Sequence, residues 1–141
     1  MIWKLVFAAS VYASALTAAQ AADLTVIVSG VRDATGLVSA GIFNSESGFA
    51  KPSEAFASFR VKAKPGSVSF TVHDLPPGRY AVTAYHDENA NGTLDFDPTG
   101  IPTEGYGVSN DARNPLAPPE FAKAAFEVRD QNKSVTVKIV Y

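Results

Sequence analysis

Residues 79–97 read RYAVTAYHDENANGTLDFD, a strand pattern that runs directly into an acidic loop pattern. Tyr80, Val82 and His86 fall on one face of this strand, and their period of two is that of a β-strand with one buried face. The Pro-Pro-Gly of residues 76–78, just before it, marks a turn. The stretch therefore predicts a strand that carries an acidic loop at one end of a β-domain.

The same alternation recurs along the rest of the chain. It predicts further strands over 23–32, 37–43, 58–64, 68–72, 121–128 and 134–141. The first of these places Leu24, Val26 and Val28 in the core. Residues 44–56 lose the pattern and predict a connection with one helical turn started by Pro52. About seven short strands without a long helix indicate an all-β fold, a single antiparallel β-sandwich of the immunoglobulin type with a long acidic loop.

The N-terminus carries the features of an export signal. Lys4 precedes an apolar run over 5–19, and Ala19-Gln20-Ala21 has the small-x-small form of a signal-peptidase site. The run is shorter than the roughly 20 apolar residues that a membrane span needs, so we favour a cleaved signal peptide over a retained anchor helix. We expect a signal peptide at 1–21 and one domain at 22–141, in the periplasm or secreted, with no membrane span in the mature chain.

Composition excludes several classes of function. The chain has no cysteine, so an exported domain must fold without disulfides. Removal of residues 1–21 takes away Lys4 alone, which leaves 11 basic against 14 acidic residues and a net charge of −3. That charge is too small to indicate nucleic acid or an anionic membrane as partner. No Gly-x-Ser-x-Gly motif, cysteine nucleophile or phosphate-binding glycine-rich loop supports catalysis, so we assign no catalytic residues.

Acidic side chains are gathered in the segment between His86 and Ala112, which contains no lysine or arginine. Its six carboxylates belong to Asp87, Glu88, Asp95, Asp97, Glu104 and Asp111. They repel one another unless something neutralises them, which makes this segment the best functional clue in the sequence.

The spacing of oxygen-bearing side chains in this segment matches the core of an EF-hand calcium loop. Ligand positions 1, 3, 5, 7 and 9 of such a loop correspond to Asp87, Asn89, Asn91, Thr93 and Asp95. The glycine at position 6 corresponds to Gly92. Position 12, normally a bidentate Glu, is Pro98, so Asp97 or Glu104 would complete the shell. We therefore expect weak calcium binding, with a Kd on the order of 0.1 to 1 mM. The alternative is a simple Asn-Gly turn with solvated acids.

His86, Glu104 and Tyr106 form a second candidate site. His86 precedes a long connection over 100–121, and Glu104 and Tyr106 lie within that connection; long ordered loops are frequently functional. We expect His86 to pack at the rim of the sandwich, hydrogen-bonded to a neighbouring carboxylate, because His73 is the only other histidine. The connection itself is expected to be a packed lid, with Ile101, Tyr106, Leu116 and Phe121 buried beneath it; an open pocket is the alternative.

The chain resembles a known family at three places. These are His86-Asp87-Glu88-Asn89 with Asn91-Gly92 and Leu94-Asp95, then 100–110 (GIPTEGYGVSN), and Pro119 with Phe121 and Ala125-Phe126. They are similar to the DUF2141 family of uncharacterised exported bacterial proteins. The resemblance covers nearly the whole of 22–141 and implies an exported domain in the cell envelope of a Gram-negative bacterium, without an activity to carry over. Residues 75–82 (LPPGRYAV) are also similar, more weakly, to transthyretin-like and Cna-B-type sandwiches, which implies a prealbumin-like topology.

Two functions are compatible with these features. The first is a non-enzymatic, monomeric binding module that uses a loop calcium site to recognise a protein or a glycan. The second is a small-ligand-binding or hydrolytic domain with a pocket under residues 100–121.

Overall fold

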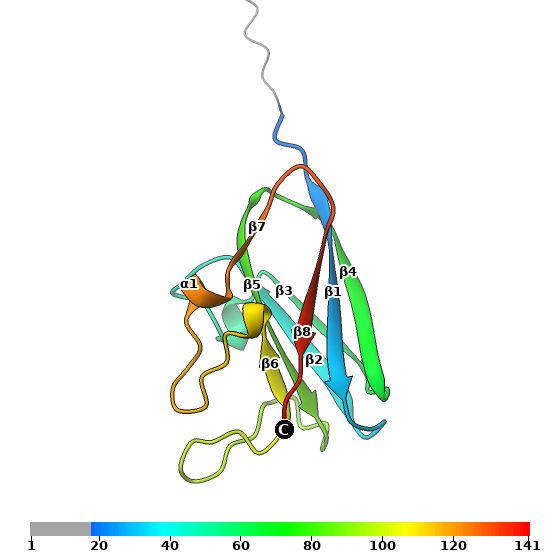
Figure 1. Cartoon of the computed structure of the whole chain (residues 1–141), viewed down its shortest axis with the longest axis vertical. Coiled ribbons are helices and arrows are strands. Elements are labelled where there is room, and N and C mark those ends of the chain that lie inside the picture. The colour runs from blue at the N-terminus through cyan, green and yellow to red at the C-terminus, as the bar shows by residue number, and fades with distance from the viewer. Residues whose placement is uncertain (1–17) are drawn as a thin grey trace, which may run out of the picture.

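The chain folds into two open β-sheets (Figure 1). The computed structural model describes residues 18–141, so most of the expected signal peptide over 1–21 lies outside the described residues. The strands are β1 (Ala22–Val31), β2 (Leu37–Phe43), β3 (Ala57–Lys62), β4 (Gly66–Leu75), β5 (Gly78–Asp87), β6 (Tyr106–Val108), β7 (Phe126–Val128) and β8 (Lys133–Lys138). Short helical turns lie at η1 (Pro52–Glu54), η2 (Ser109–Asp111) and α1 (Phe121–Ala124). The all-β prediction is confirmed, as is the helical turn that begins at Pro52.

One sheet has three strands in the order β4-β1-β8, and the other has the order β3-β2-β5-β6, with β7 also paired to β5. β6 and β7 share one edge of β5: β7 pairs with Gly78–Tyr80 and β6 with Thr83–Tyr85. Among residues 18–141, no helix is both long and apolar enough to cross a membrane.

The prediction of a purely antiparallel arrangement is wrong for one strand pair. β8 runs parallel to β1, from Leu24 opposite Lys133 to Ser29 opposite Lys138. β8 follows β7, which belongs to the other sheet, so the chain crosses between sheets before it reaches the edge of β1. Alternating apolar residues look the same in either strand direction, so the sequence pattern could not reveal this.

Two segments between Tyr106 and Val128 also differ from the prediction. Residues 121–124 form the helical turn α1 rather than the start of a strand; Phe121 and Ala124 are buried, whereas Ala122 is exposed. This spacing of three suits a helix, and alanine and lysine have high helix propensity. The short strand β6 was missed because it contains Gly107, a poor strand former. A Cβ at that glycine would lie 2.3 Å from the backbone oxygen of Lys138, so no other residue fits there without a shift.

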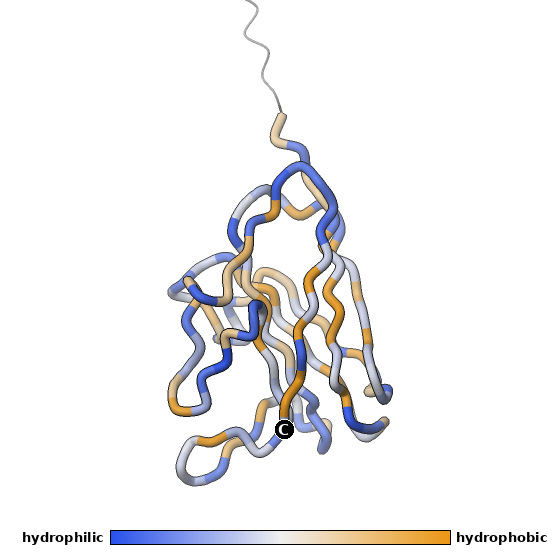
Figure 2. The backbone as a smooth tube through the Cα atoms, in the orientation of Figure 1, coloured by the Kyte–Doolittle hydropathy of each residue, from blue (hydrophilic) through white to orange (hydrophobic). Residues whose placement is uncertain are grey.

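The main core lies between the two sheets. Leu24, Val26 and Val28 of β1 are fully buried, as predicted, and pack in one cluster with residues of β2, β5 and β8. Figure 2 shows the hydrophobic residues concentrated along the strands and the hydrophilic ones in most connecting loops.

A smaller aromatic cluster covers part of the opposite face of the five-stranded sheet. Phe43, Phe49 and Phe121 stack edge to face, with ring centroids 5.6 Å apart in each neighbouring pair. This cluster closes one end of that face, so the side chains further along β2 and β5 lie beside an open space rather than under a second layer.

Candidate functional site

A groove of about 880 Å³ lies on the face of the five-stranded sheet that points away from the main core. Strand pairing places two rows of side chains across its floor. The first row contains Arg60, Ser39, Tyr85 and Tyr106, and the second contains Ser58, Gly41, Thr83 and Val108. Residues directly opposite in antiparallel strands have Cβ atoms about 5 Å apart, so each row is continuous. The second row is built mostly of small residues.

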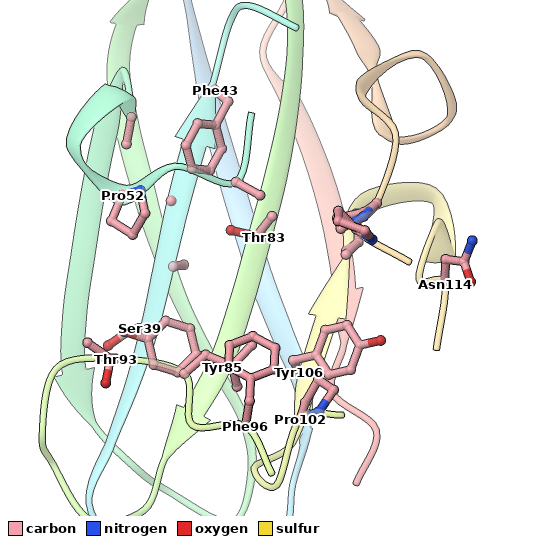
Figure 3. Close-up of a pocket in the computed structure, with 18 of the residues that line it drawn as sticks. Ser39, Phe43, Pro52, Thr83, Tyr85, Thr93, Phe96, Pro102, Tyr106 and Asn114 are labelled. Atoms are coloured by element: carbon pink, nitrogen blue, oxygen red, sulfur yellow. The ribbon is translucent and has the colours of Figure 1, made fainter. Parts of the chain in front are cut away.

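Aromatic rings and loops form the walls of the groove. In the close-up, the rings of Tyr85, Phe96 and Tyr106 gather at one end, Phe43 and Pro52 lie at the other, and Thr83 lies between them (Figure 3). The acidic loop contributes residues 92–94, Phe96 and 99–102, and the connection before α1 contributes residues 114–119.

Large hydrophobic side chains at the rim are exposed. Phe96 is 56% exposed, Ile101 49% and Leu116 90%, and all three line the groove. Exposed apolar side chains that cluster around a concave surface indicate a binding site for an apolar partner, whereas isolated ones are common on any protein surface. The expected packed lid is therefore only partly present. Phe121 joins the aromatic cluster, and Tyr106, which also lines the groove, packs partly against it, whereas Ile101 and Leu116 border open space.

Two polar side chains of the first row stand out. Ser39 is 6% exposed, and its hydroxyl has no hydrogen-bond partner among the described residues. An unpaired buried hydroxyl costs about 1–3 kcal/mol relative to a paired one. Arg60, which lies opposite it on β3, is the only charged residue among the described residues that line the groove. The floor thus offers one hydroxyl and one cation side by side.

The acidic loop begins at Asp87, whose buried carboxylate holds the loop's first turn. It accepts hydrogen bonds from the backbone N–H of Asn91 (3.1 Å) and of Gly92 (2.8 Å). The Tyr85 hydroxyl donates to the Gly92 carbonyl oxygen at 3.0 Å, which fixes the same turn against the groove. The turn therefore connects the acidic loop to the aromatic row.

The predicted calcium ligands up to Asp95 come together. The Asp95 carboxylate accepts from the side-chain amides of Asn89 (2.7 Å) and Asn91 (2.8 Å). The Asn91 side-chain oxygen accepts from the backbone N–H of Thr93 at 3.1 Å. Within residues 18–141, however, no group of three acidic, histidine or cysteine side chains is arranged to hold a metal ion. In this structure the Asp95 carboxylate is satisfied by hydrogen bonds from the two asparagine amides.

Asp97 takes part in a different turn. Its carboxylate accepts from Thr99 (N–H 2.8 Å, hydroxyl 2.6 Å) and from the N–H of Ile101 (3.0 Å). These hydrogen bonds lower the pKa of Asp97, and the one from the Thr99 hydroxyl has the largest effect. Asp97 is thus committed to the second half of the loop and not to the cluster around Asp95.

Glu104 joins the two ends of the first half of the loop. It is 7% exposed, and its two carboxylate oxygens accept from the backbone N–H of Glu88 (2.9 Å) and of Asp95 (3.1 Å). It does not line the groove. Glu104 therefore acts on the groove indirectly, by holding the loop that forms one of its walls.

His86 faces the main core and does not line the groove either. Its Nε2 atom donates to the carbonyl oxygen of Thr35 (2.6 Å), so its Nδ1 atom accepts from the Tyr141 hydroxyl (2.7 Å). The expected hydrogen bond to a carboxylate is not made; the nearest carboxylate oxygens, of Glu88 and Asp33, lie 3.7 and 3.8 Å away. Of the predicted trio His86, Glu104 and Tyr106, only Tyr106 lies at the groove.

Sequence reasoning missed most of the groove residues. Part of the signal was present in β2 and β5, because the outward positions of β2, and those of β5 between Arg79 and Asp87, hold no charged residue. Ser39, Gly41 and Phe43 alternate on β2, and Thr83 and Tyr85 on β5. A strand with apolar or small residues on both faces is typically covered on both faces, unlike one with a solvated face.

Comparison with known proteins identifies a family. A family model, described as an uncharacterized protein conserved in bacteria (DUF2141), matches residues 26–136. No curated protein and no solved structure matches the chain. The match runs from within β1 to within β8 and includes the acidic loop and every groove-lining residue. The chain belongs to the DUF2141 family of bacterial proteins.

Proposed function

We propose that the protein is an exported, non-enzymatic binding module of the bacterial cell envelope, in the periplasm or secreted, that holds a small ligand in the groove of its five-stranded sheet. The export signal predicted from the sequence at 1–21 supports the location. In this proposal the two sheets form a prealbumin-like or immunoglobulin-like β-sandwich, which is supported by the core that they share.

One observation carries the binding proposal: an open groove of about 880 Å³ whose floor holds a buried hydroxyl without a partner. Small-molecule sites typically have volumes of about 300–1,000 Å³, with mostly apolar and aromatic walls and a few placed polar groups. The groove has all three properties. Thr83, in the second row of the floor, is a small side chain at a position where a larger one would reach into the groove.

The Thr83→Trp variant tests this proposal, because an indole at this position fills the middle of the floor. The probe is N-phenyl-1-naphthylamine, a neutral apolar dye whose fluorescence rises on transfer out of water. We expect the wild-type protein to bind the dye and Thr83→Trp to bind it roughly tenfold or more weakly. Thr136→Trp is the matched control, because Thr136 is exposed on β8 in the other sheet. Equal dye binding by all three proteins, with unchanged circular dichroism, would overturn the proposal.

We propose further that the acidic loop binds calcium weakly and that the ion orders the groove wall. The convergence of Asn89, Asn91 and Asp95 supports this, since these oxygen-bearing side chains are already in contact. The two amides, which now donate to Asp95, would turn their oxygens toward the ion. Asp87 would contribute while it still accepts the N–H groups of the turn. Carboxylate and amide oxygens are the ligands that calcium prefers.

Calcium is expected to raise the melting temperature of the wild-type protein. At a calcium concentration of about ten times Kd, linkage gives about 1.4 kcal/mol, which corresponds to about 5 °C for a domain of this size. Asp95→Asn, which removes one charge with little change of shape, should abolish the shift. Asp111→Asn removes a charge outside the loop turn and should retain it. The idea fails if wild-type melts are identical in calcium and in chelator and calorimetry detects no heat of binding.

A further inference from the structure

We infer that the ligand of the groove is a small apolar molecule with one anionic head group, a carboxylate or a sulfonate, bound with its head at Arg60 and Ser39. This inference rests on the proposed binding function and specifies the chemistry of the ligand. It follows from the charge, the unpaired hydroxyl and the apolar walls of the groove.

The apolar part of the ligand follows from the walls. Tyr85, Phe96 and Tyr106 present ring faces and edges at one end, and Leu116 and Ile101 extend the apolar surface at the rim. Burial of apolar surface against such side chains drives binding without fixing orientation. Orientation must come from the few polar groups of the floor.

The anionic head follows from Arg60. Carboxylate partners of arginines in this structure are found at Arg32, Arg113 and Arg129, whereas Arg60 has no such partner among the described residues. No aspartate or glutamate within residues 18–141 lines the groove, because the loop carboxylates accept hydrogen bonds from the loop itself. An arginine beside an apolar site is suited to an anion with at least two oxygens, such as a carboxylate or a sulfonate, which it can bind through two parallel N–H donors.

The position of the head follows from strand register. Ser39 on β2 lies directly opposite Arg60 on β3, so the hydroxyl and the base of the arginine side chain are neighbours. The Arg60 guanidinium lies against the acidic loop, where its Nη2 atom would be 3.3 Å from a Cβ at Gly92. A head group placed between the floor and this loop can accept from both Ser39 and Arg60, while its apolar part lies over Tyr85 and Thr83.

A matched pair of dyes tests the inference. 8-Anilinonaphthalene-1-sulfonate is N-phenyl-1-naphthylamine with one added sulfonate, so the two share the same rings and differ in charge. We expect the wild-type protein to prefer the anionic dye. Arg60→Gln should weaken binding of the anionic dye roughly tenfold or more, in line with the loss of a charge-assisted hydrogen bond. The affinity for the neutral dye should stay unchanged. Decanoate should displace the dyes from the wild-type protein more effectively than 1-decanol does, and this difference should vanish in Arg60→Gln.

Two further variants separate a specific contact from general electrostatics and from folding. Lys62→Gln removes the same charge from the same strand two residues away, outside the groove lining, and should leave the preference for the anionic dye intact. Ser39→Ala should weaken decanoate binding several-fold without lowering the melting temperature, because its hydroxyl has no partner in the protein.

The outcomes distinguish this inference from the proposed function. Equal binding of both dyes, with loss of both in Thr83→Trp, would overturn the anionic head group and leave the groove as a binding site. Failure of both dyes to bind would overturn the groove itself. A wild-type dimer in light scattering that becomes a monomer in Leu116→Ser would show that a second copy of the chain occupies the groove, which also contradicts the inference.

Discussion

Gly36→Ala is expected to reduce the free energy of unfolding by about 3–5 kcal/mol, the largest effect of a single methyl group in this domain. Gly36 lies in the turn between β1 and β2 with a φ of +67°, where an L side chain is strained. A Cβ there would lie 2.1 Å from the backbone oxygen of Asp87 and 2.7 Å from that of Glu88. The backbone at the start of the acidic loop would have to move to accommodate it. Urea denaturation of both proteins measures the loss.

Gly66→Ala is the matched control for this substitution. Gly66 also has a positive φ (+95°), but a Cβ there meets nothing within 4 Å. Its cost should be limited to backbone strain, about 1 kcal/mol. If the two variants lose the same stability, the contact between Gly36 and the acidic loop does not have the role assigned to it.

Glu104→Ala is expected to cost about 3 kcal/mol, because two backbone N–H groups lose a charged acceptor and one buried side chain is removed. The amides concerned are those of Glu88 and Asp95, which delimit the first half of the acidic loop. Hydrogen exchange measured by NMR should show that both amides lose protection through local opening of the loop. Amides of β1 should exchange faster only by the amount that the lower free energy of global unfolding explains. Because this half of the loop contributes residues 92–94 to the groove, dye binding should weaken in the same variant.

Glu104→Gln separates the two hydrogen bonds from simple burial. The amide keeps one acceptor oxygen and directs its N–H₂ group at the other backbone N–H, so its effect should fall between wild type and alanine. Unchanged exchange at Glu88 and Asp95 in Glu104→Ala would show that the loop does not depend on this carboxylate.

The strands with one buried face could be predicted from the sequence because burial alternates with every residue. Leu24, Val26 and Val28 satisfied that pattern. The direction of β8 could not be predicted, because apolar and polar residues alternate in the same way in parallel and antiparallel strands. The strand β6 could not be predicted because it has only three residues, centred on Gly107. The helical turn at Phe121 was missed because alanines fit either period.

One part of the candidate site could also be predicted from the sequence and another part could not. The acidic loop from Asp87 to Asp95 could be found because its residues are contiguous, and the structure brings them into contact. The groove could not, because Ser39, Arg60 and Tyr106 come from three strands far apart in sequence and meet only through strand register. A pattern along one strand shows which residues share a face, but not which strand lies next to it.

The groove as ligand site is tested most directly by intermolecular nuclear Overhauser effects between bound 8-anilinonaphthalene-1-sulfonate and the protein. The account predicts contacts from the dye rings to the ring protons of Tyr85 and Tyr106 and to the methyl group of Thr83, all of which line the groove. Contacts to the outward side chains of β1, β4 and β8 instead, with none to these three residues, would contradict it.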